Sequence, residues 1–159
     1  MTRPTALITG ASRGIGRAIA VRLATTYDLV IVAREQASLN ETAAAARTVG
    51  AQVQSLPLDV SDSAAVATML ADVDADLLVN NAGVAVMRPF LEMTAEEWHR
   101  MVDVNINALY HVTRAVLPGM VKRGRGHVCT IGSIAGRNTF AGGTCYSGTK
   151  HFVMGFAES

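Results

Sequence analysis

TGASRGIG, residues 9–16, stands directly after the short apolar run Ala6–Thr9 and directly before a helical pattern. A glycine at the first position of the loop permits a tight turn, and the two later glycines let a ligand or another backbone come close. The free N–H groups and the positive end of the following helix then suit a phosphate. This order of strand, glycine-rich turn and helix predicts the pyrophosphate loop of a dinucleotide-binding fold. The candidate binding residues in the loop are Gly10, Ser12, Arg13, Gly14, Ile15 and Gly16.

Strand and helix patterns alternate along the whole chain. Short apolar runs predict five strands, at residues 6–9, 29–32, 53–58, 77–79 and 127–131. Longer helical patterns cover residues 15–26, 38–49, 61–73, 94 to near 118, and 146 to the end. Ser61 is the expected N-cap of the third helix, and Thr94-x-x-Glu97 is a capping box for the fourth. The alternation predicts an α/β fold, a doubly wound parallel sheet (Rossmann fold) covered on both faces, with residues 1–159 forming a single domain.

The residues at the end of the second strand bear on the choice of dinucleotide. An NAD-binding protein is expected to place Asp or Glu about 20 residues beyond the glycines, where it binds a ribose hydroxyl. Here the sequence reads Val32-Ala33-Arg34, and a guanidinium suits a 2′-phosphate instead. Arg13 would add a second cation, so the sequence favours NADP(H). Asp59, at the end of the third strand, would accept a hydrogen bond from the adenine amino group, with Val60 beside it.

The same loop also fits a different class of enzyme. Gly10-Ala11-Ser12-Arg13-Gly14 matches the G-x-S-x-G turn that presents the nucleophilic serine of α/β-hydrolases. Such an enzyme needs a downstream acid and then a histidine, and the chain contains His99, His111, His127 and His151. The motif lies on the first strand, however, before most of the sheet is built. A serine hydrolase using Ser12 is therefore kept as a remote alternative.

A tyrosine and a lysine stand four residues apart in Tyr146-Ser147-Gly148-Thr149-Lys150, near the start of the last helix. At this spacing both side chains lie on one helix face. A free tyrosine loses its proton only near pH ~10, and a neighbouring ammonium favours the phenolate. The pair therefore suits proton exchange with a substrate oxygen.

Taken together, these motifs resemble the short-chain dehydrogenase/reductase family. The resemblance rests on Thr9-Gly10…Gly14-Ile15-Gly16, Asn80-Asn81-Ala82-Gly83, Ser133 and Tyr146-x-x-x-Lys150, in matching order along nearly the whole chain. It implies strand order 3-2-1-4-5 and hydride transfer between NADP(H) and a carbonyl or alcohol. It also implies that Asn81, Ala82 and Gly83 line the cofactor.

The resemblance further implies roles for four catalytic candidates. Tyr146 would be the general acid in reduction and the base in oxidation, while Lys150 would favour its phenolate and bind the nicotinamide ribose. Ser133 would orient the substrate oxygen. Asn105 would hold a water that links Lys150 to solvent as a proton relay.

Members of this family are usually longer, and the resemblance implies that two further strands, their helix and a substrate-covering loop are missing. We therefore expect the chain to be a fragment of a longer enzyme, with an inactive or merely NADP-binding product as the alternative. Homo-tetramers or homo-dimers are common in the family, and a homo-oligomer is expected here. The sequence does not select a particular carbonyl or alcohol substrate.

Composition excludes several other classes of protein. Half of the 159 residues are apolar, 17% are charged and the formal net charge is +1, which favours a globular fold and gives no sign of nucleic-acid binding. Two cysteines are too few for a disulfide framework, and no clustered ligand set or H-E-x-x-H predicts a metal. No apolar stretch reaches the ~18 residues of a membrane span, and no signal peptide is recognisable. A cytoplasmic protein without a membrane partner is expected.

Overall fold

A computed structural model describes residues 3–159, so the first two residues of the predicted 1–159 domain lie outside it. Five parallel strands form one sheet with the order β3-β2-β1-β4-β5. The strands are β1 (Thr5–Thr9), β2 (Asp28–Ala33), β3 (Val53–Pro57), β4 (Leu77–Asn80) and β5 (His127–Thr130). The helices are α1 (Gly14–Leu23), α2 (Gln36–Arg47), α3 (Ser63–Met69), α4 (Ala95–Val102), α5 (Ala108–Arg123) and α6 (Thr144–Glu158). The predicted fold class and strand order are confirmed.

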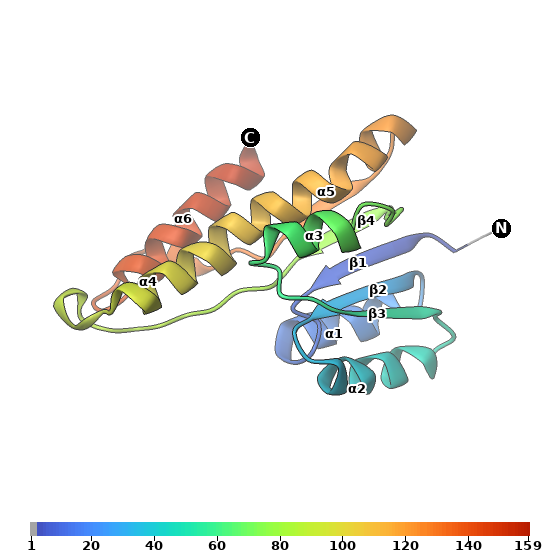
Figure 1. The fold of residues 1–159 in the computed structure, drawn as a ribbon, viewed down its shortest axis with the longest axis horizontal. Coiled ribbons are helices and arrows are strands. Elements are labelled where there is room, and N and C mark those ends of the chain that lie inside the picture. The colour runs from blue at the N-terminus through green and yellow to red at the C-terminus, as the bar shows by residue number, and fades with distance from the viewer. Residues whose placement is uncertain (1–2) are drawn as a thin grey trace.

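Helices cover both faces of the sheet, with α1 and α2 on one side and α3 and α5 on the other (Figure 1). Alternate residues of the buried strands serve the two sides. On β1, Leu7 belongs to the core beneath α3 and α5, whereas Ala6 and Ile8 belong to the core beneath α1 and α2. The same alternation on β2 separates Val30 from Ile31. The sheet is therefore the shared middle layer of two apolar cores.

β5 differs from the other strands because its side chains are largely exposed. Its register pairs Leu77 with His127 and Asn80 with Thr130, and it pairs with β4 alone among the described strands. His127, Val128 and Cys129 are exposed to solvent. Within residues 3–159, β5 is thus an open edge of the sheet.

The predicted third helix begins and ends at other residues than expected. Its N-cap is Asp62, whose Oδ1 accepts hydrogen bonds from the N–H groups of Ala64 and Ala65. The prediction of Ser61 as N-cap was wrong, because the Ser61 hydroxyl donates to Asp59 instead. α3 then stops at Met69, four residues earlier than the predicted end at residue 73.

The long helix predicted from residue 94 is divided by one turn of π-helix, Asp103–Asn107, between α4 and α5. Thr94 and Glu97 form the predicted capping box at its start. Pro118 lies inside α5, which continues to Arg123, where the prediction ended the helix near the proline. The interruption is tolerated because Pro118 and Arg114, the residue one turn before it, are both exposed, so water can reach the carbonyl that lost its partner. Gly124, with φ of 65°, ends the helix in the left-handed conformation.

Two further segments complete the chain: short 3-10 turns at Phe90–Glu92 and Ile134–Gly136. α6 packs along α4 and the π turn, which places its Tyr-bearing end beside the carboxyl ends of the strands. No helix among residues 3–159 is long and apolar enough to cross a membrane.

Candidate active site

A cavity of about 450 Å³ lies where the five parallel strands end. Its volume falls within the range of small-molecule sites, about 300–1,000 Å³. All fourteen residues predicted from the sequence to touch a cofactor line it: Gly10, Ser12, Arg13, Gly14, Ile15, Gly16, Arg34, Asp59, Val60, Asn81, Ala82, Gly83, Tyr146 and Lys150. The fold therefore brings segments from five strand ends and α6 around one space.

The glycine loop has the backbone that its sequence predicts. Gly10 and Gly14 have φ angles of 66° and 55°, in the region that side chains disfavour. A Cβ on Gly16 would collide with the carbonyl oxygen of Gly10, whereas a Cβ on Gly14 would meet no described atom within 4 Å. The space over Gly14 is thus open, and no side chain caps the start of α1. Uncapped N–H groups at an open helix N-terminus fit an anionic group such as a pyrophosphate.

Thr9 and Asn81 fasten the loop after β4 to the glycine loop. The Thr9 hydroxyl accepts hydrogen bonds of 3.0 Å from the N–H groups of Asn81 and Ala82. In return, the Asn81 side-chain amide donates to the carbonyl oxygens of Thr9 and Gly10, at 2.9 and 3.2 Å. Thr9 belongs to the motif that resembles the family, but no role was predicted for its side chain.

One part of the cavity wall is rich in charge, with Arg13, Arg34, Arg100 and Asp59. Burial raises the pKa of Asp59, but hydrogen bonds from the Ser61 hydroxyl and N–H and the nearby Arg34 and Arg100 guanidinium groups outweigh it, so the net pKa is lowered. Asp59 is therefore a stable carboxylate acceptor. Arg100 was not foreseen, because the tertiary fold, and no local motif, brings α4 to this cavity.

Tyr146 and Lys150, both on α6, also line the cavity. The Lys150 side chain is buried, with 8% of the residue exposed, and its Nζ donates a 2.8 Å hydrogen bond to the carbonyl oxygen of Ile131. Nζ lies 6.0 Å from the centroid of the Tyr146 ring. Burial lowers the pKa of the Lys150 ammonium below its ordinary value of 10.5. The arrangement can hold a positive charge close to the phenol.

Asn105 lies in the π turn, and both the oxygen and the nitrogen of its side-chain amide form hydrogen bonds with neighbouring groups. Oδ1 accepts from the Val84 N–H at 2.8 Å, and Nδ2 donates to the Val84 carbonyl at 2.8 Å and the Thr149 hydroxyl at 3.0 Å. The residue is 3% exposed. Asn105 thus joins the loop after β4 to α6, the helix that carries Tyr146 and Lys150.

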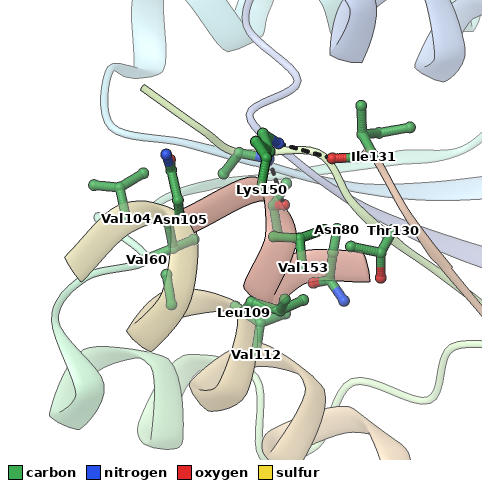
Figure 2. Close-up of a pocket in the computed structure, with 13 residues that line it drawn as sticks. Val60, Asn80, Val104, Asn105, Leu109, Val112, Thr130, Ile131, Lys150 and Val153 are labelled. Carbon is green, nitrogen blue, oxygen red and sulfur yellow. Dashed lines mark hydrogen bonds between the residues drawn. The ribbon is translucent and has the colours of Figure 1, made fainter. Parts of the chain in front are cut away.

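A second, much smaller cavity of about 20 Å³ separates Asn105 and Lys150 from the ends of β4 and β5 (Figure 2). Polar groups in its lining come from Thr9, Asn80, Asn105, Thr130 and Lys150. A space this large with several polar partners is sufficient for one water molecule.

Ser133 lines neither cavity, although its neighbour Gly132 lines the large one. Its hydroxyl accepts a 3.1 Å hydrogen bond from the Ala135 N–H and so caps the 3-10 turn that follows. Of the four predicted catalytic residues, the fold therefore groups Asn105, Tyr146 and Lys150, with Ser133 at the rim of this group.

The hydrolase alternative finds no base near its serine. Ser12 lines the large cavity, but none of the four histidines does. His151 instead places Nδ1 2.8 Å from the carbonyl oxygen of Ser147 on α6. Among residues 3–159 there is also no group of three or more His, Cys, Asp or Glu side chains that would hold a metal ion.

Comparison with known proteins adds sequence and structural relatives. The sequence model of the family described as short chain dehydrogenase matches residues 4–159. NADP-dependent 3-hydroxy acid dehydrogenase of Salmonella typhi is 41% identical over 162 residues, covering 95% of this chain and 62% of its own. The 3-oxoacyl-[acyl-carrier-protein] reductase of Escherichia coli K12 is 36% identical over 159 residues, covering 97% of this chain and 64% of its own.

A solved metagenomic short-chain oxidoreductase in complex with NADP superposes with a TM-score of 0.93 at 36% identity. The match covers 98% of this chain and 73% of that one. The chain thus spans 62% of the length of the 3-hydroxy acid dehydrogenases that it resembles.

Proposed function

The chain belongs to the short chain dehydrogenase family. We propose that it is the cofactor-binding and catalytic part of an oxidoreductase that moves a hydride between NADP(H) and a carbonyl or alcohol. The observation that carries the proposal is the single cavity that collects all fourteen predicted cofactor residues, Tyr146 and Lys150 among them.

The cofactor-binding roles follow the order of the residues around the cavity. The glycine loop and the N-terminus of α1 hold the pyrophosphate. Arg34 and Arg13 bind the 2′-phosphate, and Asp59 accepts from the adenine amino group. Two relatives, one an NADP-dependent dehydrogenase and the other solved in complex with NADP, support this choice over NAD(H).

When bound, the nicotinamide supplies or accepts the hydride. In reduction Tyr146 donates its proton to the substrate oxygen, and in oxidation it takes the proton back. Ser133 donates a second hydrogen bond to that oxygen, because its own oxygen only accepts from the Ala135 N–H and its O–H is still available to donate. Both donors stabilise developing negative charge on the oxygen more than the ground state. Lys150 holds positive charge beside the phenol throughout.

The proton that Tyr146 gives up is replaced from solvent. A water in the small cavity that Asn105 and Lys150 both line would link the ammonium to the outside, which is the relay expected from the family. Asn105 orients that path by fixing the Val84 backbone and Thr149, rather than by touching the reacting atoms.

The substrate class is proposed from the relatives. One acts on 3-hydroxy acids and another on 3-oxoacyl thioesters, so both share a carbonyl or hydroxyl at the third carbon of an acyl group. We take 3-oxoacyl and 3-hydroxyacyl compounds as the class to test first. A non-catalytic NADP-binding role on the same fold is the alternative.

The assembly is proposed as a cytoplasmic homo-dimer or homo-tetramer, with this chain as one domain. Apolar side chains on one face of α5 support self-association: Tyr110, Leu117 and Val121 are exposed, by 70% at Val121. Light scattering after gel filtration would measure the mass of the assembly, and a monomer at micromolar concentration would contradict this part.

Fluorescence titration with NADPH and NADH, followed by a turnover assay with 3-oxoacyl and 3-hydroxyacyl substrates, tests the function. Tight NADPH binding, weaker NADH binding and turnover would support the whole proposal. Binding without turnover would favour the non-catalytic alternative. A folded chain that binds neither dinucleotide would overturn the cofactor assignment.

A further inference from the structure

Thr42 is a polar residue buried within α2, and the function proposed so far gives it no role. Its side chain has no exposed surface, and it does not line the large cavity. A threonine within a helix can bond its hydroxyl to a carbonyl of the preceding turn, as Thr68 does to Ala64 in α3. The Thr42 hydroxyl instead donates a 2.9 Å hydrogen bond to the carbonyl oxygen of Ala11 in the glycine loop. This bond attaches α2 directly to that loop.

Arg17 of α1 completes the attachment, and α1 lies beside α2 on one face of the sheet (Figure 1). The Nε–H of Arg17 is shared between the Thr42 hydroxyl, at 3.2 Å, and the Ser12 carbonyl oxygen, at 3.0 Å. One terminal nitrogen donates to the same Ser12 carbonyl and forms an ion pair with Glu41 of α2, at 2.8 Å. Arg17 does not line the large cavity either. Its donors are therefore directed at the loop and at α2, and not at a bound molecule.

The attachment joins the two segments that carry Arg13 and Arg34. The carbonyls that it holds come immediately before Arg13, and α2 begins immediately after Arg34 and its N-cap Glu35. The Ala11 N–H donates a 3.1 Å hydrogen bond to the carbonyl oxygen of Val32 in β2. Arg13 and Arg34 thus each lie two residues beyond a backbone hydrogen bond between the loop and β2, and both line the large cavity.

We infer that Thr42 and Arg17 are positioning residues for the 2′-phosphate site. They keep Arg13 and Arg34 at the separation that one phosphate group requires. Hydrogen bonds between arginine and phosphate depend on geometry, so a loop that shifts against α2 would weaken the contact with one arginine or the other. The inference rests on the proposed binding of NADP(H), and it gives these two residues a part in the preference for NADPH.

The pyrophosphate part of the loop has separate support. The Asn81 side-chain amide donates to the carbonyl oxygens of Thr9 and Gly10, and loss of the Thr42 hydroxyl leaves these bonds in place. NADH has the pyrophosphate but lacks the 2′-phosphate. Its affinity should therefore respond much less than that of NADPH.

The test measures dissociation constants for NADPH and NADH by calorimetry on the unmodified chain and its variants. Thr42→Val keeps the shape of the side chain but lacks the hydroxyl, whereas Thr42→Ser keeps the hydroxyl. Arg17→Lys keeps the charge but lacks the planar donor fork. The control is Thr48→Val, because Thr48 is exposed at the end of α2 and its hydroxyl bonds Ala45 of its own helix. Thermal unfolding of each sample shows whether the variant is folded at the temperature of the titration.

Thr42→Val is expected to weaken NADPH about fivefold and NADH less than about twofold, because the contacts with the 2′-phosphate lose their alignment. Arg17→Lys should shift the ratio of the two affinities in the same direction. Thr42→Ser and Thr48→Val should leave both affinities close to those of the unmodified chain. In an Arg34→Ala background, Thr42→Val should no longer weaken NADPH, because one of the two arginines that it positions is gone.

Equal losses for NADPH and NADH in Thr42→Val, or no loss for either, would overturn the inference and leave the proposed function standing. A loss for NADPH that persists undiminished in the Arg34→Ala background would also overturn it, because the effect would then bypass the 2′-phosphate site. If Thr42→Val does not fold, Arg17→Lys decides by the same criteria. Absence of NADPH binding by the unmodified chain would overturn the proposed function and the inference together.

Discussion

The ammonium of Lys150 lies 6.0 Å from the centre of the Tyr146 ring, yet its hydrogen bond goes to the carbonyl oxygen of Ile131, at 2.8 Å. The lysine is thus anchored to the backbone beyond β5 and does not depend on the phenol for its position. No described residue hydrogen-bonds the Tyr146 hydroxyl. The phenol hydroxyl is therefore free to contact a substrate, as the proposed mechanism requires.

Replacing Tyr146 by Phe separates chemistry from cofactor binding. We expect turnover of a 3-oxoacyl substrate to fall by at least about 100-fold, because the proton donor is lost. The dissociation constant for NADPH should change little, since the phenylalanine ring keeps the shape of that wall. Steady-state kinetics and fluorescence titration of the same sample make the comparison. Undiminished turnover would remove Tyr146 from the mechanism.

The lowered pKa of Lys150 predicts how stability changes with pH. In the folded chain this lysine loses its proton at lower pH than in the unfolded chain, where the ordinary value is 10.5. Between those two pKa values the unfolded state binds more protons, so the free energy of unfolding rises with pH. Below both values the group is charged in both states and its burial cost is fully present.

Lys150→Met removes this titration. Urea unfolding of both chains from about pH 8 upward should show the unmodified chain gaining stability relative to Lys150→Met as pH approaches that of the unfolded lysine. The difference between the two chains isolates the lysine from other groups that titrate in this range. A constant difference, or one that falls with pH, would contradict the lowered pKa.

The strands were predictable because most of them contain a short apolar run, whereas the strand order 3-2-1-4-5 was expected from the family resemblance. Helix boundaries were less predictable, because neighbouring side chains compete for the same role. Ser61 and Asp62 are both good N-cap residues. Asp62 caps the helix because the Ser61 hydroxyl donates its hydrogen bond to Asp59 instead. The π turn was likewise not predictable, because it produces no distinct hydrophobic period in the sequence.

The residues of the candidate site also divide into those that the sequence predicts and those that it does not. Residues within a local motif, such as Gly10, Gly16 and the Tyr146–Lys150 pair, could be named from spacing. Arg100 could not, because no local motif contains it and only the tertiary fold brings α4 to the cavity. Ser133 was named through the family resemblance, and its observed hydrogen bond to Ala135 is a local capping contact that spacing would also allow.

Arg34 should decide between the two dinucleotides. Arg34→Ala is expected to weaken NADPH binding by about tenfold or more, because a charge-assisted contact with the 2′-phosphate is lost. NADH, which lacks that phosphate, should bind the variant and the unmodified chain alike. Fluorescence titration measures both dissociation constants. The matched control is Arg22→Ala, which removes an exposed arginine of α1 that does not line the cavity. Equal losses for NADPH and NADH would assign Arg34 to another part of the cofactor.

Asn105 should matter for stability as well as for the proton path. Asn105→Ala leaves the partly buried N–H and carbonyl of Val84 without their partners and opens space around a buried side chain, so we expect a loss of about 2–4 kcal/mol in the free energy of unfolding. Asn107, in the same π turn, is exposed and bonds only Asp103, so Asn107→Ala should cost less than about 0.5 kcal/mol. Chemical denaturation measures both, and similar small losses would mean that the Val84 backbone finds other partners.

Gly16 tests whether the close approach at the glycine loop is required. A Cβ there would collide with the Gly10 carbonyl and come within 2.5 Å of the Asn81 amide. Either the backbone of the glycine loop or the Asn81 side chain must therefore move. Gly16→Ala should therefore lower the free energy of unfolding by about 2–4 kcal/mol and abolish NADPH binding. In α6, a Cβ on Gly155 meets nothing within 4 Å of the described chain, so Gly155→Ala should be neutral or stabilising by up to about 1 kcal/mol. If Gly16→Ala matched Gly155→Ala in stability and still bound NADPH, the loop would not need a glycine at this position for packing. The hydrogen bonds from Asn81 to the loop would then not depend on the close approach at Gly16.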